Sequence, residues 1–253
     1  MFAFIYARGE LAGADALAYW TGVQRWLRGE DIYQVIPGLY VAPRDGALPY
    51  AYAPWSLYVF LPFGLIPWDI VWPLWRAANL VLFALSVGWA YQRRPLATAA
   101  LVAVLGPALA ANLDTGNINI VLALMVWAAW WSSPQIGGFL WALGAGLKFV
   151  PAALLPFVPT RAWGYGFMTL GVMILLTLAT WPQTVRQLDI VINYPRPLRI
   201  DYMMLLWAVV PWLYSRPLRP RLDRDWLAVV NRAKREAVGD TVVTEPASSQ
   251  FDT

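Results

Sequence analysis

Lys148 is the residue whose chemistry is most distinctive in this sequence. It is the only charged side chain between Thr115 and Thr160, within the apolar segment GGFLWALGAGLKFVPAALLPFVP. A charge at membrane depth is costly and is retained where it faces a cavity, a partner or a ligand. No carboxylate lies beside it in sequence, and lysine binds phosphate as a point charge, so the position predicts contact with an anion such as a phosphate. The alternative is a lysine that snorkels to the membrane interface.

The composition indicates a membrane protein and limits its chemistry. Hydrophobic residues make up 59% of the 253 residues and charged residues only 13%, whereas soluble domains carry about 25% charged residues. Cysteine and histidine are both absent, which excludes disulfides, thiolate metal sites and the commonest general base. Acid–base chemistry therefore falls to Asp, Glu, Lys or Tyr. We expect no metal, no cofactor and no nucleic-acid partner.

The elements that must position these groups are helices. Residues 15–29 predict an amphipathic helix at the membrane surface, because Leu17, Trp20, Val23 and Leu27 recur at spacings of three and four. This helix belongs to a predicted outer juxtamembrane region at residues 8–69.

Four prolines interrupt residues 49–68, which favours a juxtamembrane or re-entrant segment over a straight span. Spans are then predicted at 70–91, 95–112, 118–132, 136–147, 149–159, 163–181 and 202–214. The pieces at 136–147 and 149–159 are each too short to cross and form either one bent element around Lys148 or two half-helices. Gly138, Ala142 and Gly146 make a small-residue stripe suited to close helix packing.

The arginines predict the orientation of the bundle. Arg93, Arg94, Arg161 and the basic residues after 215 can all lie on the cytoplasmic side. We therefore expect a multi-pass bundle at 1–215, with spans at 70–214, and a partly disordered cytoplasmic basic tail at 216–253. This topology brings Asp15, Asp114 and Lys148 together on the non-cytoplasmic side of the cytoplasmic membrane.

The N-terminal residues MFAFIYA are too short to cross a bilayer, which takes about 20 apolar residues. We expect either a further span upstream of this sequence or a chain that begins at the membrane interface.

The order of several short motifs resembles a known enzyme family. GADALAYWTGVQRWLRGEDIYQ is followed by YAYAPWSLYVFLPFGLIPW, then LWRAANL, DTGNINIVLAL and GGFLWALGAGLKFVPAALLPF. This order, over about residues 13–165, resembles the polytopic glycosyltransferases of family 87 in the GT-C superfamily, which include polyprenol-phosphate-mannose-dependent mannosyltransferases. The resemblance implies an all-α transmembrane bundle of GT-C type with an amphipathic juxtamembrane helix in the first outer loop.

The resemblance also implies roles for individual residues. Asp15 occupies the place of the superfamily's first outer-loop aspartate, which acts as catalytic base. Gly116 and Asn119 match the family's Gly-Gln-x-Asn, with Asn117 in place of glutamine. Leu147, Lys148 and Pro151 match its Leu-Lys-x-x-Pro. Other matches lie in the aromatic-proline run and at the end of the helix motif: Tyr50, Tyr52, Pro54, Asp31 and Tyr33.

Sugar transfer from a lipid phosphate would need a carboxylate that takes the acceptor's proton and a cation that stabilises the leaving phosphate. Asp15 and Lys148 would supply these groups. The expected substrate contacts are Lys148, Asn117, Asn119, Tyr50, Tyr52, Arg76 and Asp114.

Each role has a structural alternative. Asp15 stands where a helix N-cap would, and aspartate is a favoured cap. Asp114 suits a turn, Asn117 and Asn119 could cap the next helix, and the aromatic-proline run suits interface packing.

The sequence thus predicts an inverting membrane glycosyltransferase. It would transfer a hexose such as mannose from a polyprenyl-phosphate sugar to a lipid or glycan acceptor, with membrane lipids as further partners. Two alternatives stay open. One is a non-catalytic subunit of a larger membrane-protein complex that keeps the scaffold, and the other is a small anion or lipid transporter that uses Lys148.

Overall fold

The structure is a computed structural model that describes residues 13–33, 50–193, 200–215, 228–233 and 235–236. Across these residues every regular element is helical, as predicted for an all-α protein. Three of the described helices are long and apolar enough to cross a membrane: Trp68–Tyr91, Pro95–Thr115 and Thr160–Ala179. The protein is therefore a membrane helix bundle. Most of the predicted tail at 216–253 lies outside the described residues.

Most of the described helices coincide in position with the predicted spans. Labels with η denote 3₁₀ helices. In chain order the elements are α2 (Ala14–Leu27), η2 (Pro54–Ser56), α3 (Leu57–Gly64), α4 (Trp68–Tyr91), α5 (Pro95–Thr115), α6 (Asn119–Ala128), α7 (Pro134–Leu147), η3 (Val150–Phe157), η4 (Thr160–Ala162), α8 (Trp163–Ala179), α9 (Trp181–Asn193), η5 (Ile200–Val209) and α10 (Val210–Ser215).

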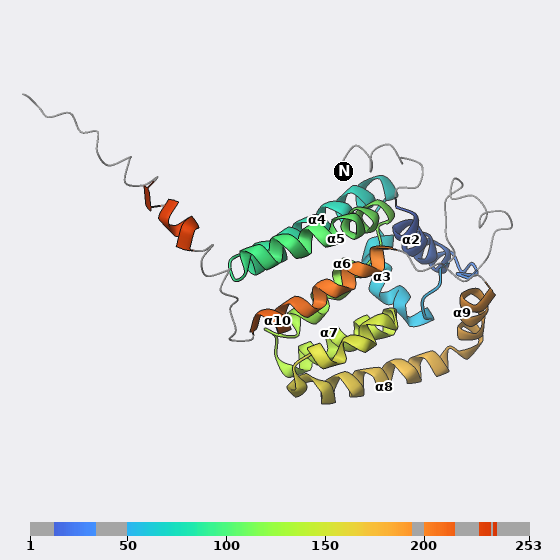
Figure 1. Cartoon of the computed structure of the whole chain (residues 1–253). Coiled ribbons are helices and arrows are strands. Elements are labelled where there is room, and N and C mark those ends of the chain that lie inside the picture. Colours follow the sequence, from blue (N-terminus) through green and yellow to red (C-terminus); the bar gives the residue numbers. More distant parts are fainter. Residues whose placement is uncertain (1–12, 34–49, 194–199, 216–227, 234, 237–253) are drawn as a thin grey trace, which may run out of the picture.

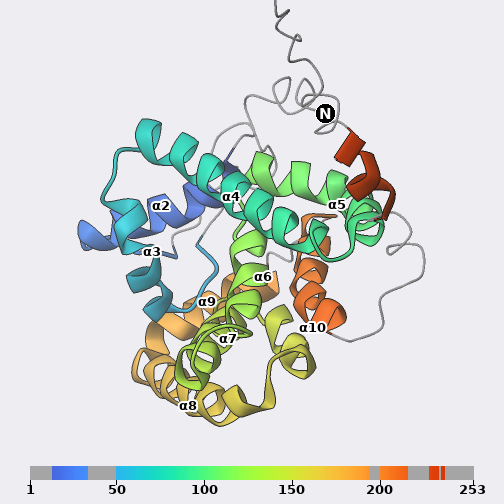
Figure 2. The same cartoon turned by 90° about the vertical axis from the view of Figure 1, so that its left-hand side faces the viewer.

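The bundle consists of two helix pairs with further helices between them (Figure 1). The α4–α5 pair is antiparallel and is joined by a short turn, whereas α7 and α8 run parallel and are joined by η3 and η4. α6 and the η5–α10 segment lie between the pairs in both views (Figures 1 and 2). There the indole of Trp127 in α6 donates to the carbonyl of Trp207 in η5 at 2.6 Å.

α2 forms where the sequence predicts it, but it is a packed helix rather than one lying only on a surface. Its buried residues are Asp15, Ala16, Ala18, Tyr19, Gly22 and Val23. Leu27, from the predicted apolar face, is 50% exposed. Gly22 explains why α2 is packed against the protein. A Cβ at this position would lie 2.5 Å from the ring of Tyr50, so only glycine lets α2 come this close to Tyr50. α2 therefore rests on α3 and on the segment around Tyr50.

The predicted span at 163–181 corresponds to α8, and a second helix, α9, follows it where no element was predicted. α8 ends at Ala179, and α9 begins at Trp181 after Thr180. Pro182 in the first turn of α9 suits a helix start, where its missing N–H costs nothing. The hydroxyl of Thr184 lies 3.0 and 3.1 Å from the carbonyl oxygens of Thr177 and Thr180 and can donate to either, which holds the corner between the two helices.

The small-residue stripe predicted on α7 is confirmed as a packing surface. A Cβ at Gly138 would lie 2.5 Å from the carbonyl oxygen of Ala162 and 2.6 Å from the amide nitrogen of Gly166. One at Gly146 would lie 2.8 Å from the sulfur of Met173. Backbone thus meets backbone where α8 begins, and the stripe sets the spacing of α7 and α8.

We expect Gly138→Ala to destabilise the bundle by about 1–3 kcal/mol, the usual cost of overpacking a filled interface. The atoms in the way belong to backbone and cannot rotate aside. Gly171→Ala on α8 is the matched control, because nothing lies within 4 Å of a Cβ there. Unfolding titrations in detergent micelles measure both variants. Equal stability of the two would contradict the close approach of α7 and α8.

Candidate functional site

The loop between α5 and α6 carries the centre of the candidate site. Gly116 ends α5 with a positive φ of 70°, a conformation that glycine adopts at little cost. A Cβ here would also come within 2.6 Å of Ala16 and of Trp72. The amides of Gly116 and Asn117 both donate to the carbonyl of Asn112, at 2.9 and 3.2 Å. This turn therefore fixes the direction in which Asn117 leaves α5.

Hydrogen bonds join side chains from α2, the α5–α6 loop, α6 and the end of α7 into one polar chain. Asn117 Nδ2 donates to Asp15 Oδ2 at 3.0 Å, and Lys148 Nζ donates to Asn117 Oδ1 at 2.6 Å. Lys148 Nζ also donates to Asn119 Oδ1 at 2.9 Å. Asn119 Nδ2 in turn donates to the carbonyl of Asp201 in η5 at 3.1 Å. Four of the predicted site residues therefore meet.

The polar side chains of this arrangement are largely buried, so each needs a defined hydrogen-bond partner. Asp15, Asn117 and Asn119 are at most 3% exposed, and Lys148 is partly exposed. Buried polar groups cost free energy unless they are hydrogen-bonded. Each amide donates on one side and accepts from Lys148 on the other, so its partners define which atom is oxygen. The amide of Asn117 thus bridges the Asp15 carboxylate and the Lys148 ammonium.

A break in the helix places Lys148 at this point. α7 ends at Leu147, and Lys148 has an extended backbone with φ −141° and ψ 136°. Pro151 then lies near the start of η3, in a position that tolerates a residue without an N–H. The sequence left one bent element or two half-helices open, and the structure has two separate pieces with the lysine between them.

Asp15 is positioned by the first turn of α2 and is not its N-cap. Gly13 is the cap residue, and no side chain caps the helix. The amide of Gly13 donates to the carbonyl of Asp114 at 2.7 Å. Asp114 is itself buried at 6% exposed, and through this bond it ties the head of α2 to the end of α5. The capping alternative for Asp15 therefore has no support in this geometry.

Tyr50 and Tyr52 lie in an aromatic cluster beside the site. Their rings pack with those of Tyr19, Tyr33 and Phe60, and both tyrosines are buried. The hydroxyls of Tyr50 and Ser56 share a hydrogen bond of 2.5 Å, and the hydroxyls of Tyr19 and Tyr52 share one of 3.1 Å. This environment suits packing, and a direct substrate contact of Tyr50 or Tyr52 stays a prediction.

Burial raises the pKa of Tyr33 and of Tyr50 well above the ordinary value for tyrosine, and the neighbouring Asp31 carboxylate raises that of Tyr33 further. Both hydroxyls stay protonated at neutral pH, so neither tyrosine suits the role of general base. Asp15 is the better candidate among the groups gathered here.

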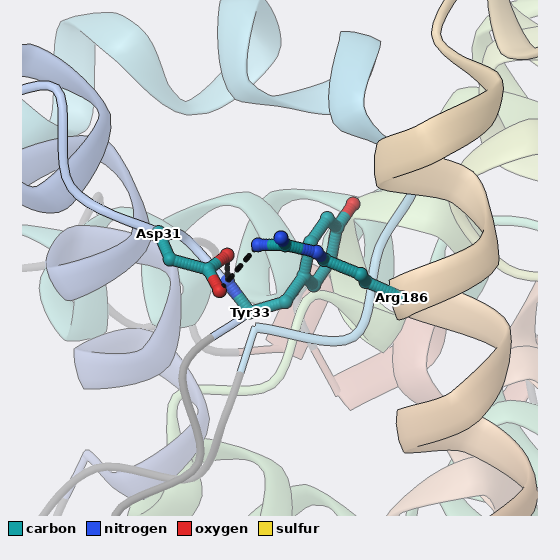
Figure 3. Close-up of polar contacts among 3 residues, drawn as sticks. All are labelled: Asp31, Tyr33 and Arg186. Atoms are coloured by element: carbon teal, nitrogen blue, oxygen red, sulfur yellow. Dashed lines mark hydrogen bonds and ion pairs between the residues drawn. The ribbon is translucent and has the colours of Figure 1, made fainter.

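Asp31 joins the segment after α2 to α9 (Figure 3). Its Oδ2 accepts from Arg186 of α9 at 2.6 Å, and its Oδ1 accepts from the amide of Tyr33 at 3.1 Å. The Tyr33 hydroxyl donates to the carbonyl of Tyr52 at 2.7 Å. Asp31 and Tyr33 thus hold loops in place, in line with a structural role for this end of the helix motif.

Arg76 does not join the polar chain in the hydrogen bonds of the described residues. Its guanidinium lies over the ring of Trp72, 5.3 Å from the centroid. The same ring packs against Gly13 and Gly116. Arg76 is therefore separated from the Asp15 region by one aromatic layer.

Asp201 and Tyr202 are site residues that the sequence reasoning missed. Asp201 is 1% exposed, and its carbonyl receives the Asn119 amide. Lys148 Nζ lies 4.8 Å from the centroid of the Tyr202 ring, a cation–π geometry. Their positions in the sequence could have identified them, because an acidic and an aromatic residue stand at the start of the predicted span at 202–214, on the side of the membrane where Lys148 was expected.

Comparison with known proteins gives a consistent set of matches. The model of glycosyltransferase family 87 matches residues 50–199, a range that includes Asn117, Asn119 and Lys148 but not Asp15. No solved structure matches the chain significantly.

Two curated relatives carry the name polyprenol-phosphate-mannose-dependent alpha-(1-2)-phosphatidylinositol pentamannoside mannosyltransferase. The protein of Mycolicibacterium smegmatis is 33% identical over 132 residues, which cover 47% of this chain and 31% of the relative. That of Mycobacterium tuberculosis is 29% identical over 118 residues, which cover 43% and 27%. The matched segments thus cover less than a third of the length of these relatives.

Proposed function

This chain belongs to glycosyltransferase family 87, and we propose that it transfers mannose from a polyprenyl-phosphate donor to a lipid or glycan acceptor. The donor is inferred from the names of the two mycobacterial relatives. The observation that carries the proposal is the chain of hydrogen bonds from Asp15 through Asn117 to Lys148. It connects a carboxylate and an ammonium through one amide, and these are the two charges that the reaction needs.

Asp15 acts as the general base in this proposal. The acceptor hydroxyl attacks the anomeric carbon of the donor sugar, and its proton passes to the Asp15 carboxylate. The bond from the anomeric carbon to the phosphate oxygen breaks, and its electron pair leaves with the polyprenyl phosphate. A single displacement of this kind inverts the anomeric centre. Asn117 orients the carboxylate through its amide hydrogen.

Lys148 stabilises the departing phosphate. Charge gathers on the leaving oxygen as the sugar acquires oxocarbenium character, and a fixed cation lowers the energy of that state. The two amide oxygens that accept from Lys148 carry no formal charge. These two contacts hold the ammonium in a fixed position beside Asn117 and Asn119. Asn119 fixes the lysine relative to η5 and Tyr202.

The placement of arginines supports a site that opens on the non-cytoplasmic face. Arg93 and Arg94 lie in the α4–α5 turn, and Arg161 donates to carbonyls of the α6–α7 turn. These turns are at the far ends of α5, α6 and α7 from Asn117 and Lys148. By the positive-inside tendency the arginine end is cytoplasmic, so the polar chain faces the other side.

Reconstituted protein tests the donor directly. Full-length chain in phospholipid vesicles would be supplied with polyprenyl-phosphate mannose labelled in the sugar, and with a membrane lipid extract as acceptor. We expect label in a new lipid or glycan product from this donor and none from labelled nucleotide-linked mannose. Transfer from the nucleotide sugar would overturn the donor class. Absence of transfer, with the chain in fixed stoichiometry in a larger complex, would favour a non-catalytic subunit.

A further inference from the structure

α9 presents three distinct faces. Thr184, Gln187 and Ile190 point into the protein. A second face carries exposed polar side chains, namely Gln183, Arg186, Asp189 and Asn193. Between these faces runs an apolar stripe of large exposed side chains, at spacings of four, three and four residues: Trp181, Val185, Leu188 and Ile192. The members of the stripe are 44–70% exposed.

The position of α9 limits what can cover this stripe. Only Thr180 separates α9 from α8, a helix long and apolar enough to cross a membrane. α9 turns away from the axis of α8 instead of continuing it (Figure 1). It must therefore start within a few ångströms of the level at which α8 leaves the apolar layer.

The apolar surface also continues from α8 into α9. Leu175 and Leu178 near the end of α8 are 66% and 54% exposed, as suits side chains that face lipid. Trp181 is the next large apolar residue along the chain and opens the stripe on α9. Tryptophan is enriched at the level of lipid headgroups.

We propose that α9 is an interfacial helix, whose stripe of Trp181, Val185, Leu188 and Ile192 lies in the headgroup layer of the leaflet where α8 ends. Helices of this type bury their apolar face about 5–10 Å into the boundary between headgroups and acyl chains and keep their polar face in water. The partner of this surface is the phospholipid bilayer.

Contacts on the other faces of α9 connect this interfacial helix to the segments around the candidate site. Arg186 binds Asp31 at 2.6 Å (Figure 3). Gln187 Nε2 donates to the carbonyl of Ala51 at 3.3 Å. Exposed ion pairs contribute little free energy by themselves. Together the two contacts nonetheless set the height above the bilayer at which residues 31 and 51 are held.

Single cysteines test the proposal, because the natural sequence has none. Val185→Cys and Leu188→Cys place a thiol on the stripe, and Gln183→Cys is the matched control on the exposed polar face. Each full-length variant would be labelled with bimane in phosphatidylcholine vesicles, some of whose lipids carry a doxyl quencher near the top of the acyl chain. We expect blue-shifted emission and several-fold stronger quenching at both stripe positions than at residue 183.

Two results would overturn the proposal. One is equal quenching at the stripe and at the control, which would place the stripe in water. The other is weak quenching together with disulfide-linked dimers of Leu188→Cys on oxidation, which would make the occupant a second copy of the chain. The two stripe variants replace exposed side chains at separate positions, so one provides the readout if the other folds poorly. The outcome does not depend on transferase activity.

Discussion

Asp15→Asn is expected to lower the kcat for mannose transfer by about 10²–10⁴-fold, the usual contribution of a positioned general base. Asparagine has the size of aspartate and can still accept the amide hydrogen of Asn117 that now reaches Asp15 Oδ2. It cannot take a proton from the acceptor hydroxyl. Initial rates at saturating donor and acceptor, in the reconstituted assay, give the comparison.

Glu30→Gln is the matched control for Asp15→Asn. Glu30 follows α2 and is exposed, with a long contact of 3.5 Å to the exposed Arg28. Its neutralisation should leave the rate unchanged. Asp15→Glu should keep part of the activity, because glutamate retains the carboxylate but places it one methylene group further from the backbone. Full activity of Asp15→Asn, in protein with an unchanged melting profile, would remove Asp15 from the mechanism.

Lys148→Met is expected to reduce kcat/KM for the lipid-phosphate donor by about 10- to 100-fold, because a hydrogen bond to a charged group contributes about 1.5–3 kcal/mol. Methionine keeps an unbranched side chain but has no charge and no donor. The loss should appear with the donor and not as a change in KM for the acceptor. Kinetics with each substrate varied in turn separate the two effects.

Lys148→Arg is the companion variant. It keeps the positive charge, although its planar guanidinium fits a site built for an ammonium imperfectly, so activity should lie between wild type and Lys148→Met. Lys148→Met also leaves the Asn117 and Asn119 oxygens without their donor, so its folding must be checked by thermal melting. A folded Lys148→Met variant with normal donor kinetics would point to a snorkelling lysine without a phosphate role.

Several features could be predicted because they depend on nearby residues alone. The spans at 70–91 and 95–112 follow from hydropathy, and the structure has helices at Trp68–Tyr91 and Pro95–Thr115. The glycine at 116 marks a turn through its own backbone freedom. The isolation of Lys148 in an apolar segment identifies a functional candidate without any model of its surroundings.

Other features depended on contacts between residues that are far apart in the sequence. The sequence predicted α2 as a helix at the membrane surface. It did not show that Gly22 lets this helix pack against Tyr50. No element was predicted between the spans at 163–181 and 202–214, so α9 was missed, although its apolar stripe recurs at helical spacing. The Asp31–Arg186 pair links residues 155 positions apart, and no local pattern predicts such a pairing.

The sequence alone determined that the chain is an all-α membrane bundle, because the transfer free energy of each apolar segment is a local property. It also determined which side chains have suitable chemistry, Asp15 and Lys148 foremost. Only the tertiary structure decided that one amide, Asn117, joins them, and that η5 supplies Asp201 and Tyr202 to the same site. The physical reason is that hydrogen bonds require positions accurate to fractions of an ångström, and the packing of α2, α5, α6, α7 and η5 sets those positions jointly.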